Sequence, residues 1–212
     1  MVSLRSNVTS KLKPAHITIA VLAAILLLAV GVIGGRLLAG SPEPGDASAD
    51  AGFARDMQRH HAQAVEMSML VLDRTDTEPV RALAYDIALT QQQQIGQMFA
   101  WLQDWGLPQT GSGTPMQWMP EHQMSPAGTG EDQMSMPGMA SAEDLDRLRD
   151  SQGDEAERLY LELMIDHHRG GVQMAQAALE TATTDQVRDL AGKLITSQSS
   201  EIDAMNALLQ SP

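Results

Sequence analysis

Residues 53–67 are FARDMQRHHAQAVEM, and residues 160–174 are YLELMIDHHRGGVQM. These two stretches open a longer correspondence. Residues 53–102 align with residues 160–209 without a gap at an offset of 107, and 16 of the 50 positions are identical. An ungapped internal match of this length indicates a duplicated structural unit. The identical pairs include Met57/Met164, His60/His167, His61/His168, Val65/Val172, Met67/Met174, Gln91/Gln198, Ile95/Ile202, Met98/Met205 and Leu102/Leu209.

Each unit has the pattern of a helical hairpin. Apolar residues recur at helical spacing and predict helices over residues 50–74 and 78–105 in the first unit. Thr77 is a candidate cap for the second of these helices, and Thr184 is its counterpart in the second unit. Gly106 and Pro108 should end the first hairpin. Because the links are short, we expect an all-α fold, an antiparallel four-helix bundle built from two duplicated hairpins.

The connection between the hairpins is long. Residues 107–140 are rich in Gly, Pro, Ser and Met without apolar periodicity, which predicts a loop or disorder. Ser141 should then cap a short helix over residues 142–150. We expect a first hairpin at 51–106, the Met-rich loop at 107–140, and the short helix with the second hairpin at 141–210, all in one domain over 51–210. So long a crossover leaves the orientation of the second hairpin open.

The amino-terminal segment differs from the rest in charge. Residues 1–40 carry a charge of +4, residues 41–212 carry −17, and residues 41–50 have the composition of a linker. Residues 17–35 have no charged side chain, which predicts a transmembrane helix within residues 17–39. The basic residues before it should stay in the cytoplasm, so we expect a single-pass membrane protein with an extracytoplasmic domain. The alternative is a cleaved signal peptide and a secreted protein, although Leu38-Ala39-Gly40 is a poor cleavage site.

Composition excludes several classes of protein. The chain has no cysteine, only 3% aromatic residues and a formal charge of −13. Without cysteine it can form neither a disulfide framework nor a thiolate metal site. The acidic balance argues against nucleic acid as a partner. No catalytic constellation is recognisable, so we expect no enzyme, and homo-oligomerisation is left open.

Polar residues interrupt the apolar stripes of the predicted helices. A buried unpaired polar group costs about 1–3 kcal/mol, so this inward-facing set needs either mutual hydrogen bonds or a bound ion. Neutral imidazole is the commonest metal ligand, and thioethers favour Cu(I). Carboxamide and carboxylate groups could orient the imidazoles. The alternative is a hydrogen-bonded polar layer that sets the register of the bundle. The candidate ligands are His60, His61, Met57, Met67, His167, His168, Met164 and Met174, and the candidate supporting groups are Gln91, Gln94, Gln198 and Glu201.

The connecting loop contains a second set of soft donors. Six methionines in a polar loop are not explained by core packing, and with one imidazole they would suit Cu(I) or Ag(I). Biased composition, or methionines that pack on the bundle surface, are the alternatives. The loop candidates are Met116, Met119, His122, Met124, Met134, Met136 and Met139.

The two paired-histidine segments, each followed by Gln-x-x-[Gln/Glu]-Ile-x-x-Met, resemble the bacterial family called domain of unknown function 305. The resemblance covers residues 50–209 and includes the segment GMASAEDLDRL. It implies a ferritin-like four-helix bundle that is exported or membrane-anchored, and some members are linked to copper binding or tolerance. The family usually has Glu where this chain has Gln94, whereas Glu201 keeps the pattern. The first half is therefore expected to bind metal more weakly, or not at all.

These observations together predict an exported, membrane-anchored metal-binding protein. Copper is the expected ion, held by His and Met ligands for sequestration or handover. The alternative is a structural or interaction module of the cell envelope with buried His–Gln/Glu pairs and no metal.

Overall fold

The computed structural model describes residues 22–31, 43–120 and 136–210. By its internal contacts the chain divides into two units, Met1–Pro42 and Glu43–Pro212. In the first unit, residues 22–31 form a helix. Among the described residues, no helix is both long and apolar enough to cross a membrane. The predicted transmembrane helix therefore has no support from the described residues, and the rest of its span lies outside them.

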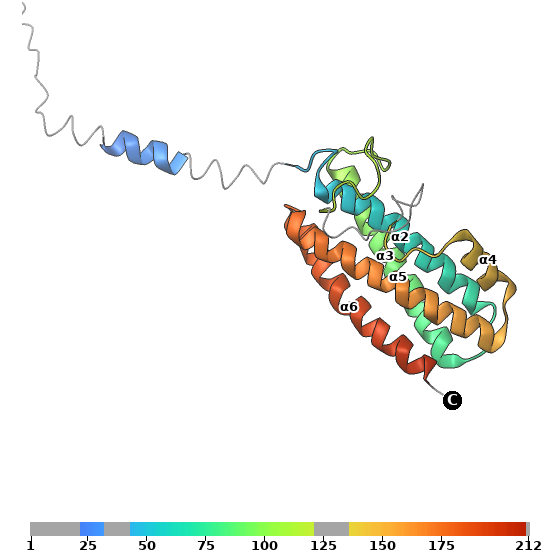
Figure 1. Ribbon diagram of the computed structural model, residues 1–212. Coiled ribbons are helices and arrows are strands. Elements are labelled where there is room, and N and C mark those ends of the chain that lie inside the picture. Colours follow the sequence, from blue (N-terminus) through green and yellow to red (C-terminus); the bar gives the residue numbers. More distant parts are fainter. Residues whose placement is uncertain (1–21, 32–42, 121–135, 211–212) are drawn as a thin grey trace, which may run out of the picture. The chain divides into compact units, whose positions relative to one another are not determined.

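The second unit contains five helices in its described residues, α2 to α6 (Figure 1). Four of them are long and one is short, as the repeat and the loop composition predict. No strand occurs in the described ranges, so the prediction of an all-helical chain is confirmed for them. The helices are α2 (Ala49–Leu72), α3 (Glu78–Asp104), α4 (Ala142–Asp150), α5 (Gly153–Thr181) and α6 (Asp185–Leu209).

Local sequence explains where most of these helices begin. Ser141 and Asp144 form a capping box at the start of α4, and the Thr184 side chain accepts a hydrogen bond from the backbone of Val187 in α6. Thr77 stands at the N-cap of α3, but its hydroxyl makes no capping bond. At the end of the first hairpin, Gly106 has φ +65°, a conformation that glycine adopts without penalty.

The two hairpins are α2 with α3 and α5 with α6, and they pack together mainly through α2 and α5. These two helices run antiparallel. Asp50, at the start of α2, accepts hydrogen bonds from the backbone and hydroxyls of Thr183 and Thr184, just beyond the end of α5. Near their other ends, Ser68 bonds to Tyr160. The orientation that the sequence leaves open is thus decided by this α2–α5 interface.

The core of the second unit contains two apolar clusters. Cluster 1 joins the beginnings of α2 and α6 to the ends of α3 and α5, and cluster 2 joins their opposite halves. Between them, the stripe of each helix is interrupted by buried polar side chains, here called the polar layer: His60, His61, Gln91, Gln94, His167, His168 and Gln198. Both apolar clusters of the described residues belong to the second unit, Glu43–Pro212, so this unit has a core of its own with which to fold.

Candidate metal centre

The four histidines of the repeat lie in the polar layer, and all are fully buried. His60 and His61 come from α2, and His167 and His168 come from α5. The rings of His60 and His167 meet with their centroids 3.8 Å apart. The ring centroids of His60 and His61 are 6.5 Å apart, and those of His167 and His168 are 6.3 Å apart. The α2–α5 interface therefore brings equivalent residues of the two repeats into contact.

The partner helices α3 and α6 carry amide and carboxylate groups in or beside the polar layer. In the second half, His168 Nε2 and Glu201 Oε2 are 2.6 Å apart. In the first half Gln94 takes the place of that glutamate, and both ring nitrogens of His61 lack a hydrogen-bond partner among the described residues. The two halves of the layer are thus chemically unequal.

Burial keeps three of the four rings neutral. Burial lowers the pKa of His60 to about 4, although the hydrogen bond from the ring to Pro137 acts in the opposite direction. Burial, reinforced by His60, lowers the pKa of His61 to about 3, and the neighbouring Gln94 amide opposes this only weakly. For His167, burial and the other three histidines hold the pKa well below 6.5. Neutral imidazole is the form that binds metal, so no proton has to leave these three rings at pH 7.

Many polar atoms of the layer have no partner within the described part of the chain. They are both ring nitrogens of His61 and His167, Nδ1 of His60 and of His168, Oε1 of Gln94, and the side-chain amide atoms of Gln91 and Gln198. Native cores usually satisfy such atoms, and each one left unsatisfied costs about 1–3 kcal/mol. An ion bound in the layer would satisfy imidazole nitrogens directly, so the residues present fit a metal that accepts nitrogen donors.

Thioether sulfur lies on both sides of the layer. Met57 and Met174 belong to cluster 1, Met67 and Met164 belong to cluster 2, and all four are fully buried. Over the ranges that the structure describes, no three His, Asp or Glu side chains are placed to hold one ion. A site with three or more ligands must therefore draw on thioether sulfur or on other donors, and thioethers favour a soft ion.

The predicted loop candidates separate into three groups. Met116 and Met119 are buried in cluster 1 with Met98, a residue that the sequence analysis did not select although it is matched in the repeat by Met205. Met136 packs partly against the same cluster, and Met139 is partly exposed. The remaining candidates, His122, Met124 and Met134, lie outside the described residues.

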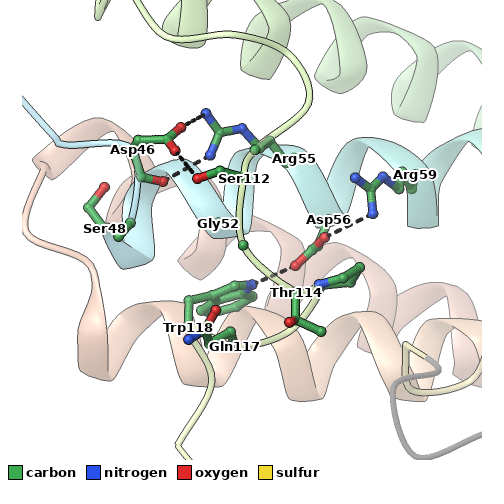
Figure 2. Close-up of a pocket in the computed structure, with 14 residues that line it drawn as sticks. Asp46, Ser48, Gly52, Arg55, Asp56, Arg59, Ser112, Thr114, Gln117 and Trp118 are labelled. Atoms are coloured by element: carbon green, nitrogen blue, oxygen red, sulfur yellow. Dashed lines mark hydrogen bonds and ion pairs between the residues drawn. The ribbon is translucent and has the colours of Figure 1, made fainter.

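The segment that carries Met116 is held against the start of α2. The carboxylate of Asp56 accepts hydrogen bonds from Met116 N at 2.8 Å and from Trp118 Nε1 at 2.9 Å. Arg55 donates to the Pro108 carbonyl and to Asp46. Asp46, Arg55, Asp56 and Trp118 line a cavity of about 390 Å³ (Figure 2). Their polar atoms bond mainly to one another, which indicates that this cavity anchors the segment to α2.

Pro137 is the contact that the sequence analysis missed. Its carbonyl oxygen lies 3.0 Å from His60 Nε2. No sequence signal could have found it, because the acceptor is a backbone group 77 residues from its partner in the chain.

A family model described as Domain of unknown function (DUF305) matches residues 50–209. The chain belongs to the DUF305 family. This confirms the resemblance inferred from the paired-histidine segments. No curated protein matches this DUF305 chain.

Solved structures similar to this DUF305 chain cover most of its length. A DUF305 protein from Streptomyces coelicolor, described as secreted, is 49% identical, with a TM-score of 0.68 over 76% of this chain and 92% of its own. A DUF305 fragment from Deinococcus radiodurans is 32% identical, with a TM-score of 0.64 over 78% and 98%. CopM in its Cu(I)-bound form is 26% identical, with a TM-score of 0.58 over 76% and 95%.

Proposed function

We propose that this DUF305 protein binds copper in its polar layer and acts by sequestration or handover, without catalysis. The observation that carries the proposal is a set of fully buried, neutral imidazoles with unpartnered nitrogens, placed between two clusters that contain methionine. Imidazole nitrogen with thioether sulfur is a donor set for Cu(I). Copper is the cargo in this proposal, and the chain supplies the ligands and excludes water around them.

The similar structures support copper as the ion. CopM, at 26% identity, is known in a Cu(I)-bound form, and at 25% identity in a silver-bound form. Cu(I) and Ag(I) are both soft ions, the class that thioethers favour. We therefore propose Cu(I) ahead of Cu(II) for this chain, with Met57, Met67, Met164 and Met174 as sulfur ligands and the four histidines as nitrogen ligands.

We also propose that the protein acts outside the cytoplasm, anchored through residues 17–39. Support for export comes from the uncharged run over residues 17–35, the basic residues before it, and the secreted description of the Streptomyces coelicolor relative. Cleavage after this run is the alternative. Sizing the mature protein by mass spectrometry, from membrane and medium fractions of its own host, would distinguish the two.

Titration of residues 43–212 with Cu(I) in competition with a chelator tests the copper proposal. Replacing Met57 and Met174 by Leu removes the sulfur but preserves the packed volume, so a loss of affinity reports on ligation. The control is the same replacement at Met69, which is exposed on α2. Leu at the loop positions Met124 and Met134 tests the loop separately. If the core variants bind as tightly as the wild type and only the loop variant loses binding, the polar layer is not the site.

A structural role without metal is the second candidate. It is favoured by the His168–Glu201 hydrogen bond, which already satisfies part of the layer. Thermal unfolding distinguishes the two candidates, because a ligand that binds only the folded state at 100 times its Kd adds about 2.7 kcal/mol of stability. A melting temperature that responds neither to Cu(I) nor to a chelator would favour the structural role.

A further inference from the structure

We propose that the chain presents Nδ1 of His60 and of His168 to the metal, and that the segment Met136–Ala140, here named the strap, enforces this choice at His60. The inference rests on the proposed function and adds the binding atoms and the contact that controls one of them.

The first observation concerns the ring of His60. Its Nε2 lies 3.0 Å from the carbonyl oxygen of Pro137 in the strap. A carbonyl oxygen can only accept a hydrogen bond, so the proton of the neutral ring is on Nε2. The lone pair is then on Nδ1, which is buried and lacks a partner in the described part of the chain.

His168 has the same arrangement with a different acceptor. Its Nε2 is 2.6 Å from Glu201 Oε2, and the Glu201 side chain is 25% exposed, so water can solvate the carboxylate. A carboxylate accepts a hydrogen bond from Nε2–H, so Nε2 is occupied, and the other ring nitrogen, Nδ1, is also buried without a partner in the described ranges. Histidines that bind metal usually donate their other N–H to a carbonyl or carboxylate in this way. His61 and His167 make no hydrogen bond of normal geometry in the described layer, so no such contact fixes their tautomer.

The strap is fixed to α2 by a pair of hydrogen bonds. The Gln63 side chain donates from Nε2 to the Ala140 carbonyl at 2.9 Å and accepts at Oε1 from the Ala140 N–H at 2.8 Å. Gln63 lies about one helical turn from His60, so this pair sets the position of the strap over the ring.

Two glycines, one in the strap and one in α5, allow the strap to lie close to the backbone of α5. Gly138 has φ +74°, and a Cβ there would lie 2.2 Å from the carbonyl oxygen of Asp166. A Cβ on Gly170 would lie 1.9 Å from the Pro137 carbonyl oxygen, the atom that accepts from His60. Because both clashes are with backbone, a side chain at either position must displace the strap. Gly170 therefore permits the Pro137–His60 hydrogen bond although it has no side chain that could bind a metal.

The tautomers can be measured without metal. In residues 43–212 labelled with ¹⁵N, long-range ¹H–¹⁵N correlation spectra distinguish protonated from unprotonated ring nitrogens. We expect His60 and His168 each as a single form protonated at Nε2. On addition of Ag(I), their Nδ1 resonances should shift while Nε2 stays protonated. A His60 ring protonated at Nδ1, or one exchanging between two forms, would overturn the proposal even if the protein binds Ag(I).

Gly170→Ala tests the control by the strap, and Gly192→Ala is its matched control. Both are helical glycines, but a Cβ on Gly192 meets no atom within 4 Å. We expect Gly170→Ala to abolish the single His60 tautomer and to weaken Ag(I) binding by about 10- to 100-fold, the usual effect of losing a group that orients a ligand. Gly192→Ala should bind as the wild type does. Should Gly170→Ala fail to fold, Gln63→Ala removes two strap hydrogen bonds without adding an atom, and the same losses are expected.

The outcomes separate this proposal from the function on which it rests. A changed His60 tautomer in Gly170→Ala with undiminished Ag(I) affinity overturns the role of the strap and leaves copper binding intact. A wild-type protein that has both tautomers as proposed but binds neither Cu(I) nor Ag(I) overturns the proposed function, and the ligand role of Nδ1 with it.

Discussion

Mild acid should destabilise the metal-free protein through its buried histidines. His60, His61 and His167 have an ordinary pKa of 6.5, which burial lowers to about 4 for His60, to about 3 for His61 and well below 6.5 for His167. Below pH 6.5 these three histidines are therefore protonated in the unfolded chain while they stay neutral in the folded chain. The stability contributed by these rings is present above pH 6.5 and is lost as the pH falls towards the folded pKa values.

The size of the effect follows from these values. Between pH 7.5 and pH 5.5, protonation in the unfolded state alone costs about 1.4 kcal/mol for each group with an unfolded pKa of 6.5. Three such histidines lower the free energy of unfolding by about 4 kcal/mol, a large share of the 5–15 kcal/mol that is usual for a domain. Ordinary carboxylates, with pKa values near 4, contribute little in this range.

Urea denaturation of residues 43–212, with a chelator present, measures this loss across the pH range. His61→Gln is the control, because it removes one titrating ring and should reduce the loss by about a third. A free energy of unfolding that changes by less than about 1 kcal/mol between pH 7.5 and 5.5 would refute the reasoning. It would mean that the folded protein accepts protons in the polar layer as readily as the unfolded chain does.

Four other substitutions give three separate tests. Gln94→Glu should give the first half of the polar layer the carboxylate that Glu201 gives the second, and so tighten Cu(I) binding by about tenfold in a chelator competition. Glu201→Gln should weaken Cu(I) binding by a similar factor, and equal affinities for the two variants would contradict this expectation. Asp50→Ala removes the acceptor for the N–H and hydroxyl groups of Thr183 and Thr184, and should lower the free energy of unfolding in urea by about 3 kcal/mol. An unchanged urea midpoint would show that this contact contributes nothing to stability. Asp56→Ala should release the segment around Met116 from α2. Peroxide should then oxidise Met116 several-fold faster, as measured by peptide mass spectrometry. An unchanged oxidation rate would show that packing alone holds the segment.

Much of the fold could be predicted because its signals are local. The spacing of apolar residues predicts α2, α3, α5 and α6 to within a few residues, and the serine at position 141 predicts the start of α4. The inward direction of the four histidines follows from the same periodicity, and the structure places all four in the core. The repeat also identifies the residues on each side that should be equivalent.

The state of the loop methionines was less predictable. Composition predicts a loop, and its described ends contain no regular helix or strand. Met116 and Met119 are nevertheless core residues, because Asp56 and Arg55 of α2 bind the segment that carries them. A long-range contact of this kind leaves no periodic trace, so the sequence could not separate buried methionines from exposed ones.

By itself, then, the sequence determined two helical hairpins with paired histidines on their inner faces, since helical periodicity depends only on residues a few positions apart. Tertiary structure decided that the hairpins meet through α2 and α5, so that His60 lies against His167 with centroids 3.8 Å apart. It also decided that a carbonyl from the strap faces His60. The docking of two apolar faces and the position of a backbone oxygen both depend on contacts between distant parts of the chain, and no local pattern specifies them.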